Sequence, residues 1–266
     1  MGTAFRLPVS GLEVIFRQTT GAEDILLAEE QNLDIRLALA LADVLVRLPN
    51  GEAAPWESLP VTDLDAALMV MRRLLVGDEV RSNVVCAMAA GDAKKGCRAR
   101  VDITFRIGDY LSHHAPSAAR DASPAEERGW WRLDGAEATY RFVSCGDQIA
   151  IEGRSDAEQE LARRCIRPEG VAGSLRRRVE AAMAKLAPNL IGDLDGVCPE
   201  CGARIRVAFD PLRYVLGELR EQAKFVFEEI HLIARHYHWS EKEILALPSA
   251  RRARYAELAS LSRGER

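Results

Sequence analysis

CRARVDITFRIGDYL (97–111) and CGARIRVAFDPLRYV (201–215) decide the expected fold, because these two stretches align over fifteen residues without a gap. The alignment places Cys97 on Cys201 and Phe105 on Phe209, and both stretches alternate apolar and polar residues as half-buried strands do. A match anchored by a cysteine and two aromatic residues favours internal duplication over a chance likeness of two short strands. The further identities are Ala99 with Ala203, Arg100 with Arg204 and Tyr110 with Tyr214.

The likeness extends upstream of both stretches. Val85-Cys86 matches Val197-Cys198, and an amphipathic helical stretch precedes each pair. Closer to the start of each half, IFRQTTGAED weakly resembles TYRFVSCGDQ. The sequence therefore predicts an α+β protein of two repeated zinc-ribbon-like β/helical units followed by a C-terminal helical hairpin. The expected divisions are a first unit at 1–111, a linker or long loop at 112–129, a second unit at 130–210 and a helical tail at 211–266.

The tail carries clear helix boundaries. Asp210-Pro211 is typical of a helix start, and the apolar stripe that follows predicts one long helix. Ser240 and Glu243 form a capping box for a short helix, with Trp239 placed to pack on Ile244 as a hydrophobic staple. After Pro248, Ser249 is expected to cap a last helix. The stripe of the long helix consists of Val215, Leu216, Leu219, Ala223, Val226, Phe227, Ile230 and Ile233.

Composition narrows the function classes. The chain has 266 residues, 48% hydrophobic and 29% charged, with a net charge of -4. Nucleic acid is an unfavoured partner because no large basic excess offsets phosphate repulsion. No apolar run approaches the ~20 residues that span a membrane, and the first residues lack the features of a signal peptide. We therefore expect an intracellular protein, with its six cysteines bound to metal or buried rather than oxidised.

The sharpest chemical motif is Cys198-Pro-Glu-Cys201-Gly. Two thiolates spaced by two residues in a tight turn can bind one tetrahedral Zn²⁺, and Gly202 permits the left-handed backbone that turns amide N–H groups toward sulfur. A redox motif would instead place its first cysteine at a helix N-terminus after a strand. Here a strand follows the turn, which favours zinc.

A closed structural zinc site needs four ligands, and the repeat supplies Cys86 and Cys97 as the other two. Their loop has ten intervening residues rather than two, although loop-closure entropy grows slowly with length. Two alternatives stay open: the first pair has lost its ligand role, or His113 or His114 replaces one cysteine. Cys145 and Cys165 are expected to be a turn residue and a buried helix residue without a function.

No sequence motif points to an enzyme. His231, His236 and His238 lack the spacing of a metalloprotease helix, and no phosphate-binding glycine loop or nucleophile elbow occurs. A zinc ion held by four cysteines has no open position for water, so it would be structural. We therefore expect no enzymatic activity and no small-molecule substrate.

Residues 198–258 resemble the phage T4-type baseplate protein family, which also occurs in contractile injection systems. Members show CPxCG, a long helix rooted at Asp, a [VI]HxLAxxYxWSExEIL segment and an RRxxY ending. The tail hairpin also resembles phage tail-assembly chaperones, which act on the tape measure protein. The matching positions are Cys198, Cys201, Gly202, Asp210, His231, Ala234, Tyr237, Trp239, Ser240, Glu241, Ile244, Leu245, Arg251, Arg252 and Tyr255.

The resemblance implies a non-enzymatic assembly factor or minor structural protein of a contractile-tail baseplate or hub, with residence in the finished particle left open. Its partner would be a tail or baseplate protein, such as a tape measure or hub component. The capped helices would offer an apolar surface to this partner, framed by arginines that attract acidic groups. The alternative is a zinc-ribbon nucleic-acid-binding module, favoured only by Arg176–Arg178 and Arg251-Arg252. The expected partner-binding residues are Tyr237, Trp239, Ile244, Leu245, Arg251, Arg252, Arg254 and Tyr255.

Overall fold

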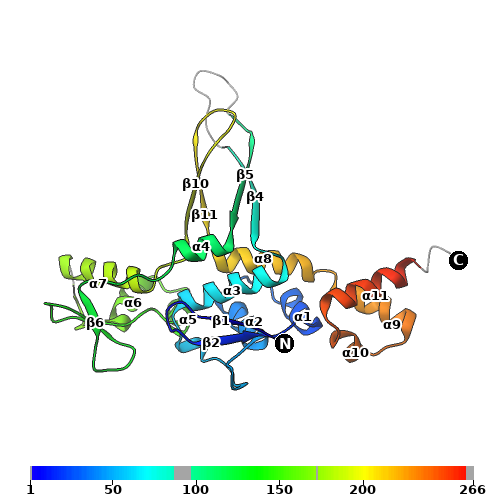
Figure 1. Ribbon diagram of the computed structural model, residues 1–266, viewed down its shortest axis with the longest axis horizontal. Helices are drawn as coiled ribbons and strands as arrows, with labels where there is room; N and C mark the ends of the chain where they lie inside the picture. Colours follow the sequence, from blue (N-terminus) through cyan, green and yellow to red (C-terminus); the bar gives the residue numbers. More distant parts are fainter. Residues whose placement is uncertain (1, 87–96, 172, 262–266) are drawn as a thin grey trace. The chain divides into compact units, whose positions relative to one another are not determined.

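A computed structural model describes residues 2–86, 97–171 and 173–261 of the protein (Figure 1). The fold is mixed α+β with small sheets, as the sequence predicts. Two compact units are each assembled from separate parts of the chain. The first takes residues up to Leu68, Val143–Leu161 and the residues from Leu212 onward, and the second takes Met69–Phe142 and Ala162–Pro211. The repeats instead predict units that are continuous in the sequence, and this division stays a prediction.

The first unit contains a three-stranded antiparallel sheet and most of the helices. Helix α1 begins at a capping box in which Thr20 and Glu23 satisfy each other's backbone N–H, and Asp34 caps α2. The residues between Glu29 and Ile35 are not helical and separate the two helices. The elements are β1 (Thr3–Arg6), β2 (Glu13–Phe16), α1 (Gly21–Glu29), α2 (Ile35–Leu45), β3 (Val46–Arg47), the 3₁₀ helix η1 (Trp56–Ser58), α5 (Cys145–Ile151), α8 (Pro211–Ala223), α9 (Val226–Tyr237), α10 (Glu241–Leu245) and α11 (Ser249–Leu261).

The second unit contains two antiparallel hairpins and a four-stranded sheet of very short strands. Part of that sheet, β6, falls inside residues 112–129, so the expected linker carries a paired strand. Helices α3 (Val61–Leu75) and α6 (Ala157–Cys165) contribute to both units. The other elements are β4 (Glu79–Val85), β5 (Arg100–Arg106), α4 (Ile107–His113), β6 (Ala122–Pro124), β7 (Trp131–Leu133), β8 (Thr139–Tyr140), β9 (Ile166–Arg167), α7 (Gly173–Leu186), β10 (Gly192–Val197) and β11 (Arg204–Phe209).

Strands β1–β2–β3 and β7–β8–β9 have the same register. Phe16 pairs with Val46 in one sheet, and Tyr140 pairs with Ile166 in the other. The residue after each central strand donates its backbone N–H to the last residue of the helix that precedes the third strand. Arg17 donates to the Leu45 carbonyl and Arg141 donates to the Cys165 carbonyl, both at 2.9 Å. The next helix begins in both halves at a capping box, Thr20 with Glu23 and Ser144 with Asp147.

Hairpins β4–β5 and β10–β11 also match residue for residue. Val85 pairs with Arg100 next to Cys86, and Val197 pairs with Arg204 next to Cys198. The Cys86 N–H donates to the Ala99 carbonyl at 2.9 Å, and the Cys198 N–H donates to the Ala203 carbonyl at 2.8 Å. Figure 1 shows the two hairpins side by side with their cysteine ends together.

The tail differs from the expectation in one respect. Its first helix starts at Pro211 as predicted, but the predicted long helix is two helices, α8 and α9, separated at Lys224-Phe225. The capping box of α10 at Ser240 and Glu243 is confirmed, and Trp239 packs on the cluster that contains Ile244. Ser249 does not act as the expected cap. Its hydroxyl lies 2.9 Å from an Asp24 carboxylate oxygen, while the Pro248 carbonyl accepts the first N–H bonds of α11.

Within the described ranges, none of the helices combines the length and the apolar character needed to cross a bilayer.

Candidate metal centre

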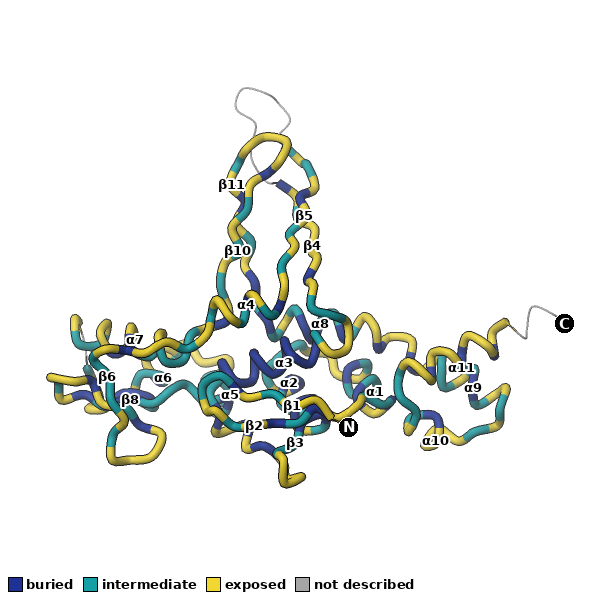
Figure 2. The backbone as a smooth tube through the Cα atoms, viewed as in Figure 1, coloured by how far each residue is buried: buried dark blue, intermediate teal, exposed yellow. Residues whose placement is uncertain are grey.

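The two hairpins pack against each other through their inner faces. Buried residues from all four segments meet in one small core: Cys86, Val101, Cys198 and Ile205. Side chains on the outer faces are exposed and mostly polar, with Arg206 lying 2.9 Å from Asp195 and Asn83 donating to Asp102. Figure 2 shows the resulting alternation of buried and exposed positions along the strands. Period-two alternation thus directs both cysteine-bearing strand ends toward the same interior.

The structure brings the four predicted cysteines together. The sulfur atoms of Cys86, Cys97, Cys198 and Cys201 all lie within 4.8 Å of one another. The closest pairs join the two hairpins: Cys86 Sγ to Cys201 Sγ is 3.7 Å, and Cys97 Sγ to Cys198 Sγ is 3.9 Å. All six cysteines of the chain are free thiols, and these separations are far above a disulfide bond of ~2.05 Å.

The sulfur positions fit a tetrahedral metal site. With metal–sulfur bonds of ~2.3 Å, tetrahedral geometry separates the sulfurs by about 3.8 Å. The two cross-hairpin distances of 3.7 and 3.9 Å bracket this value. The four cysteines are therefore compatible with one bound metal ion. The ten residues that connect Cys86 to Cys97 lie outside the described residues.

The Cys198–Cys201 turn supplies backbone donors to sulfur. Gly202 has a φ of +69°, the left-handed value expected for it, and its N–H donates to the Cys198 carbonyl at 2.9 Å. Burial would raise the pKa of the Cys198 thiol, but the N–H groups of Cys201 and Glu200 and the neighbouring thiols donate to its sulfur. Together they lower this pKa to about 7. The lowered pKa makes Cys198 ready to supply a thiolate ligand.

The second cysteine of each pair is equivalent in its surroundings. The Cys97 sulfur accepts from the Ala99 N–H, and the Cys201 sulfur accepts from the Ala203 N–H, two residues on in both cases. These amides lower the pKa of each thiol, but burial and neighbouring thiols outweigh them, so the pKa of Cys97 and of Cys201 is raised. Without a metal, Cys198 therefore loses its proton more readily than Cys97 or Cys201, and a divalent cation would favour the loss of the thiol protons of its ligands.

An aromatic cluster fixes the opposite end of the hairpins. The ring of Phe209 lies 5.2 Å from both Phe105 and Tyr110, in edge-on arrangements. The buried Tyr110 hydroxyl donates to the Leu190 carbonyl at 2.6 Å. The phenylalanines that anchor the sequence alignment are therefore contact partners, and they hold the two hairpins together far from the cysteines.

The histidine alternative finds no support in the geometry. His114 accompanies Tyr110, with ring centroids 4.2 Å apart and Nδ1 at 2.9 Å from the Tyr110 carbonyl. Among the described residues, the cluster with metal-ligand spacing contains cysteines alone. Cys165 is buried at the end of α6, as expected, whereas Cys145 is the buried first residue of α5 and not the expected turn residue. Burial with nearby aspartates raises the pKa of Cys145 to about 12.

The expected partner-binding residues fall into two groups. Tyr237, Trp239 and Tyr255 stack on one another at the surface with ring centroids 5.1–5.7 Å apart, and all are half-buried. Arg251 and Arg254 are exposed, and Arg254 pairs with Glu257. These five remain accessible in part.

The other three expected partner residues are used inside the chain, which corrects their assignment. Ile244 is fully buried in the core of the last three helices. Leu245 packs so closely on Gly21 that a Cβ there would lie 2.4 Å from its Cδ2. Arg252 is buried between α1 and α9, where it binds Asp24 and, at 2.7 Å, Glu229. A charged residue with helical spacing looks like a surface residue in sequence, so these contacts escaped prediction.

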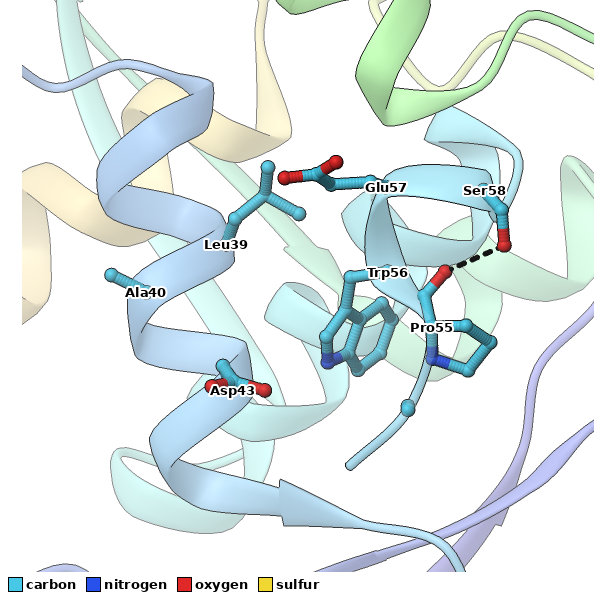
Figure 3. Close-up of a pocket in the computed structure, with 8 residues that line it drawn as sticks. Leu39, Ala40, Asp43, Pro55, Trp56, Glu57 and Ser58 are labelled. Atoms are coloured by element: carbon cyan, nitrogen blue, oxygen red, sulfur yellow. Dashed lines mark hydrogen bonds between the residues drawn. The ribbon is translucent and has the colours of Figure 1, made fainter. Parts of the chain in front are cut away.

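Sequence reasoning also missed a pocket in the first unit, between α2 and the segment that contains η1 (Figure 3). The pocket has a volume of about 530 Å³. The buried Trp56 lines this pocket, and the indole N–H of Trp56 has no acceptor among the described residues. In the sequence, this site is marked only by an isolated tryptophan after Pro55. A single tryptophan is equally expected in an ordinary hydrophobic core, so it does not predict a pocket.

The four-cysteine cluster is the candidate metal site among the residues that the structure describes. Comparisons of the chain with models of protein families, with curated proteins and with solved structures find no match.

Proposed function

We propose that the four cysteines hold one structural zinc ion that joins the two hairpins. The observation that carries this proposal is the cross-hairpin pairing of sulfurs at 3.7 and 3.9 Å, which suits tetrahedral Zn²⁺. Cysteine thiolates bind zinc strongly, whereas Mg²⁺ and Ca²⁺ prefer oxygen ligands. Four protein ligands leave no coordination position for water or substrate, so the ion has a structural role in a non-enzymatic protein.

We also propose that the two halves are copies of one zinc-ribbon-like unit. Matched registers in the β1–β2–β3 and β7–β8–β9 sheets support this, as do the matched cysteine hairpins. The capping boxes at Thr20 and Ser144 occupy corresponding positions as well. Because each copy offers two cysteines, a closed site needs both, and zinc would couple the folding of one copy to that of the other.

We further propose that the scaffold serves assembly of a contractile-tail baseplate or hub. Support comes from the resemblance of the Cys198-to-tail segment to that family, from the half-buried aromatic stack of Tyr237, Trp239 and Tyr255, and from the exposed Arg251. Aromatic and arginine side chains are the residue types that contribute most to protein interfaces. The proposed partner is an acidic segment of a tail or baseplate protein that docks on this stack.

Removal of residues 238–266 would be a poor test, because Ile244 and Arg252 stabilise the first unit. Charge reversal at two exposed positions, Arg251→Glu with Arg254→Glu, leaves that core intact. In a host that lacks the gene, we expect this variant to restore few tails, counted by electron microscopy. A control with the same charge change, Arg6→Glu with Arg132→Glu, should restore wild-type numbers. Normal tail numbers with the Arg251/Arg254 variant would exclude this surface.

A further inference from the structure

The pocket beside Trp56 lies outside the repeated architecture. Thirteen residues separate β3 from α3, whereas five separate β9 from α7 at the corresponding place in the second half. The longer connection carries Pro55, Trp56 and Glu57, which form one side of the pocket. The additional residues in the first half thus build one side of this cavity. Zinc binding and hairpin packing make no use of it.

The floor of the pocket is apolar and its edge is acidic. Leu39 and Ala40 on α2 lie opposite Pro55 and the Trp56 indole, while the side chains of Asp43 and Glu57 belong to exposed residues at the edge (Figure 3). A volume of about 530 Å³ lies within the range of roughly 300–1,000 Å³ that ligand pockets occupy. Two carboxylates around an apolar floor complement a ligand with an apolar stem and a positively charged head.

The indole N–H of Trp56 specifies a second feature of the ligand. It is sealed from water and finds no hydrogen-bond acceptor among the residues that the structure describes, although buried donors are nearly always paired. Figure 3 shows the indole nitrogen on the side of the ring toward Asp43. For a ligand to reach this nitrogen, neighbouring side chains such as the exposed Asp43 have to move. A carbonyl oxygen of the ligand would then satisfy the N–H.

From these features we infer that the pocket binds an arginine or lysine side chain of a partner polypeptide. The aliphatic stem covers Leu39 and Ala40, and the negative charges of Asp43 and Glu57 at the edge of the pocket attract the cationic head. A backbone carbonyl of the same segment accepts the hydrogen bond from Trp56 Nε1. A free cation such as a polyamine would satisfy the carboxylates and leave the indole N–H unpaired, so the geometry favours the polypeptide.

The test is a titration of the full-length protein with N-acetyl-arginine N-methylamide, followed through the ¹H–¹⁵N resonance of the Trp56 indole. Trp56→Phe assigns this resonance by its disappearance. We expect a saturable downfield shift, as a newly formed hydrogen bond produces. The norleucine and glutamate analogues, which lack the positive head, should leave the resonance in place. Agmatine has the guanidinium group and no carbonyl, and it should shift the resonance far less.

Neutralising the acidic edge supplies the matched comparison. Asp43→Asn with Glu57→Gln should weaken binding roughly fivefold, the loss expected for two exposed charge pairs. Glu13→Gln with Glu29→Gln changes the charge equally at exposed positions away from the pocket and should leave binding within about twofold. An unchanged indole resonance, an equal response to the glutamate analogue, or an equal response to agmatine would each overturn the inference.

Discussion

The sulfur atoms of Cys97 and Cys198 lie 3.9 Å apart although 101 positions separate these residues in the sequence. The second close pair, Cys86 with Cys201, spans 115 positions. A metal ion bound at this point would therefore link segments that are remote in the unfolded chain. Such a link stabilises the folded state because the metal binds the four cysteines together only when the chain is folded.

Metal removal should loosen the two hairpins. We expect a chelator to increase amide hydrogen exchange at Cys86 and Cys198, whose N–H groups bond to Ala99 and Ala203 next to the cluster. Helices α1 and α9 of the first unit should keep their protection. The measurement is exchange followed by mass spectrometry with and without chelator. Unchanged protection of both hairpins would contradict a structural role for the metal.

The six cysteines should differ in reactivity. At pH 8 with metal bound, iodoacetamide should modify none of the four cluster cysteines, and after chelation Cys198 and the exposed Cys201 should react first. Buried Cys145 should stay unmodified in both states. Peptide mapping of the alkylated protein gives the comparison, and alkylation of Cys145 as fast as Cys201 would contradict the described burial.

Cys145 also sets a pH dependence. Burial, followed by the charges of Asp65 and Asp63, raises the pKa of this thiol from its usual 9.0 to about 12. The folded state thus holds the proton more tightly than the unfolded chain. The stability that this thiol contributes is fully present below about pH 9 and is lost as the pH rises toward 12. Cys145→Ala should flatten the fall in unfolding free energy across this window, measured by urea unfolding.

Two glycines offer a matched test of the cysteine turn. Gly202 and Gly11 have φ values of +69° and +70°, and each N–H donates to the carbonyl four residues earlier. A Cβ would meet no atom within 4 Å at either position, so alanine introduces backbone strain alone, about 1 kcal/mol. Both Gly→Ala variants should lose similar stability, but zinc affinity should fall about fivefold for Gly202→Ala alone. Equal zinc affinities in the two variants would contradict the role of this turn.

Arg252 should be a main stabilising residue of the first unit. Its side chain is 3% exposed between Asp24 and Glu229, so Arg252→Met would leave two partly buried carboxylates unpaired. The expected loss is about 3 kcal/mol in the free energy of unfolding. Arg254→Met removes an exposed pair with Glu257 and should cost less than ~1 kcal/mol. Urea unfolding of the two variants gives the comparison, and equal losses would contradict the buried network.

The four cysteines could be predicted because the repeat made their positions equivalent. Cys86 and Cys97 have no compact motif of their own, and the alignment with Cys198 and Cys201 identified them. The prediction of one long tail helix failed at Lys224-Phe225, since the apolar stripe continues past the break and contains no proline or glycine. The spacing of apolar residues indicates which face of a helix is buried, but it does not show where one helix ends and the next begins.

Other features are beyond reasoning from local sequence. Strands β6 to β9 have two or three residues each, too few to show an alternating pattern. The composition of the two units depends on contacts between segments far apart in the chain. The burial of Arg252 depends on acidic partners on α1 and α9, because an arginine is buried only where such partners neutralise it.

The most direct test of the central claim is metal analysis of the purified protein combined with X-ray absorption at the zinc edge. We expect one zinc per chain, surrounded by four sulfurs at ~2.3 Å. Cys86→Ser and Cys201→Ser should each lose the metal, while Cys145→Ala retains it. A metal-free protein, or zinc bound by only two sulfurs with nitrogen or oxygen ligands, would contradict the four-cysteine site.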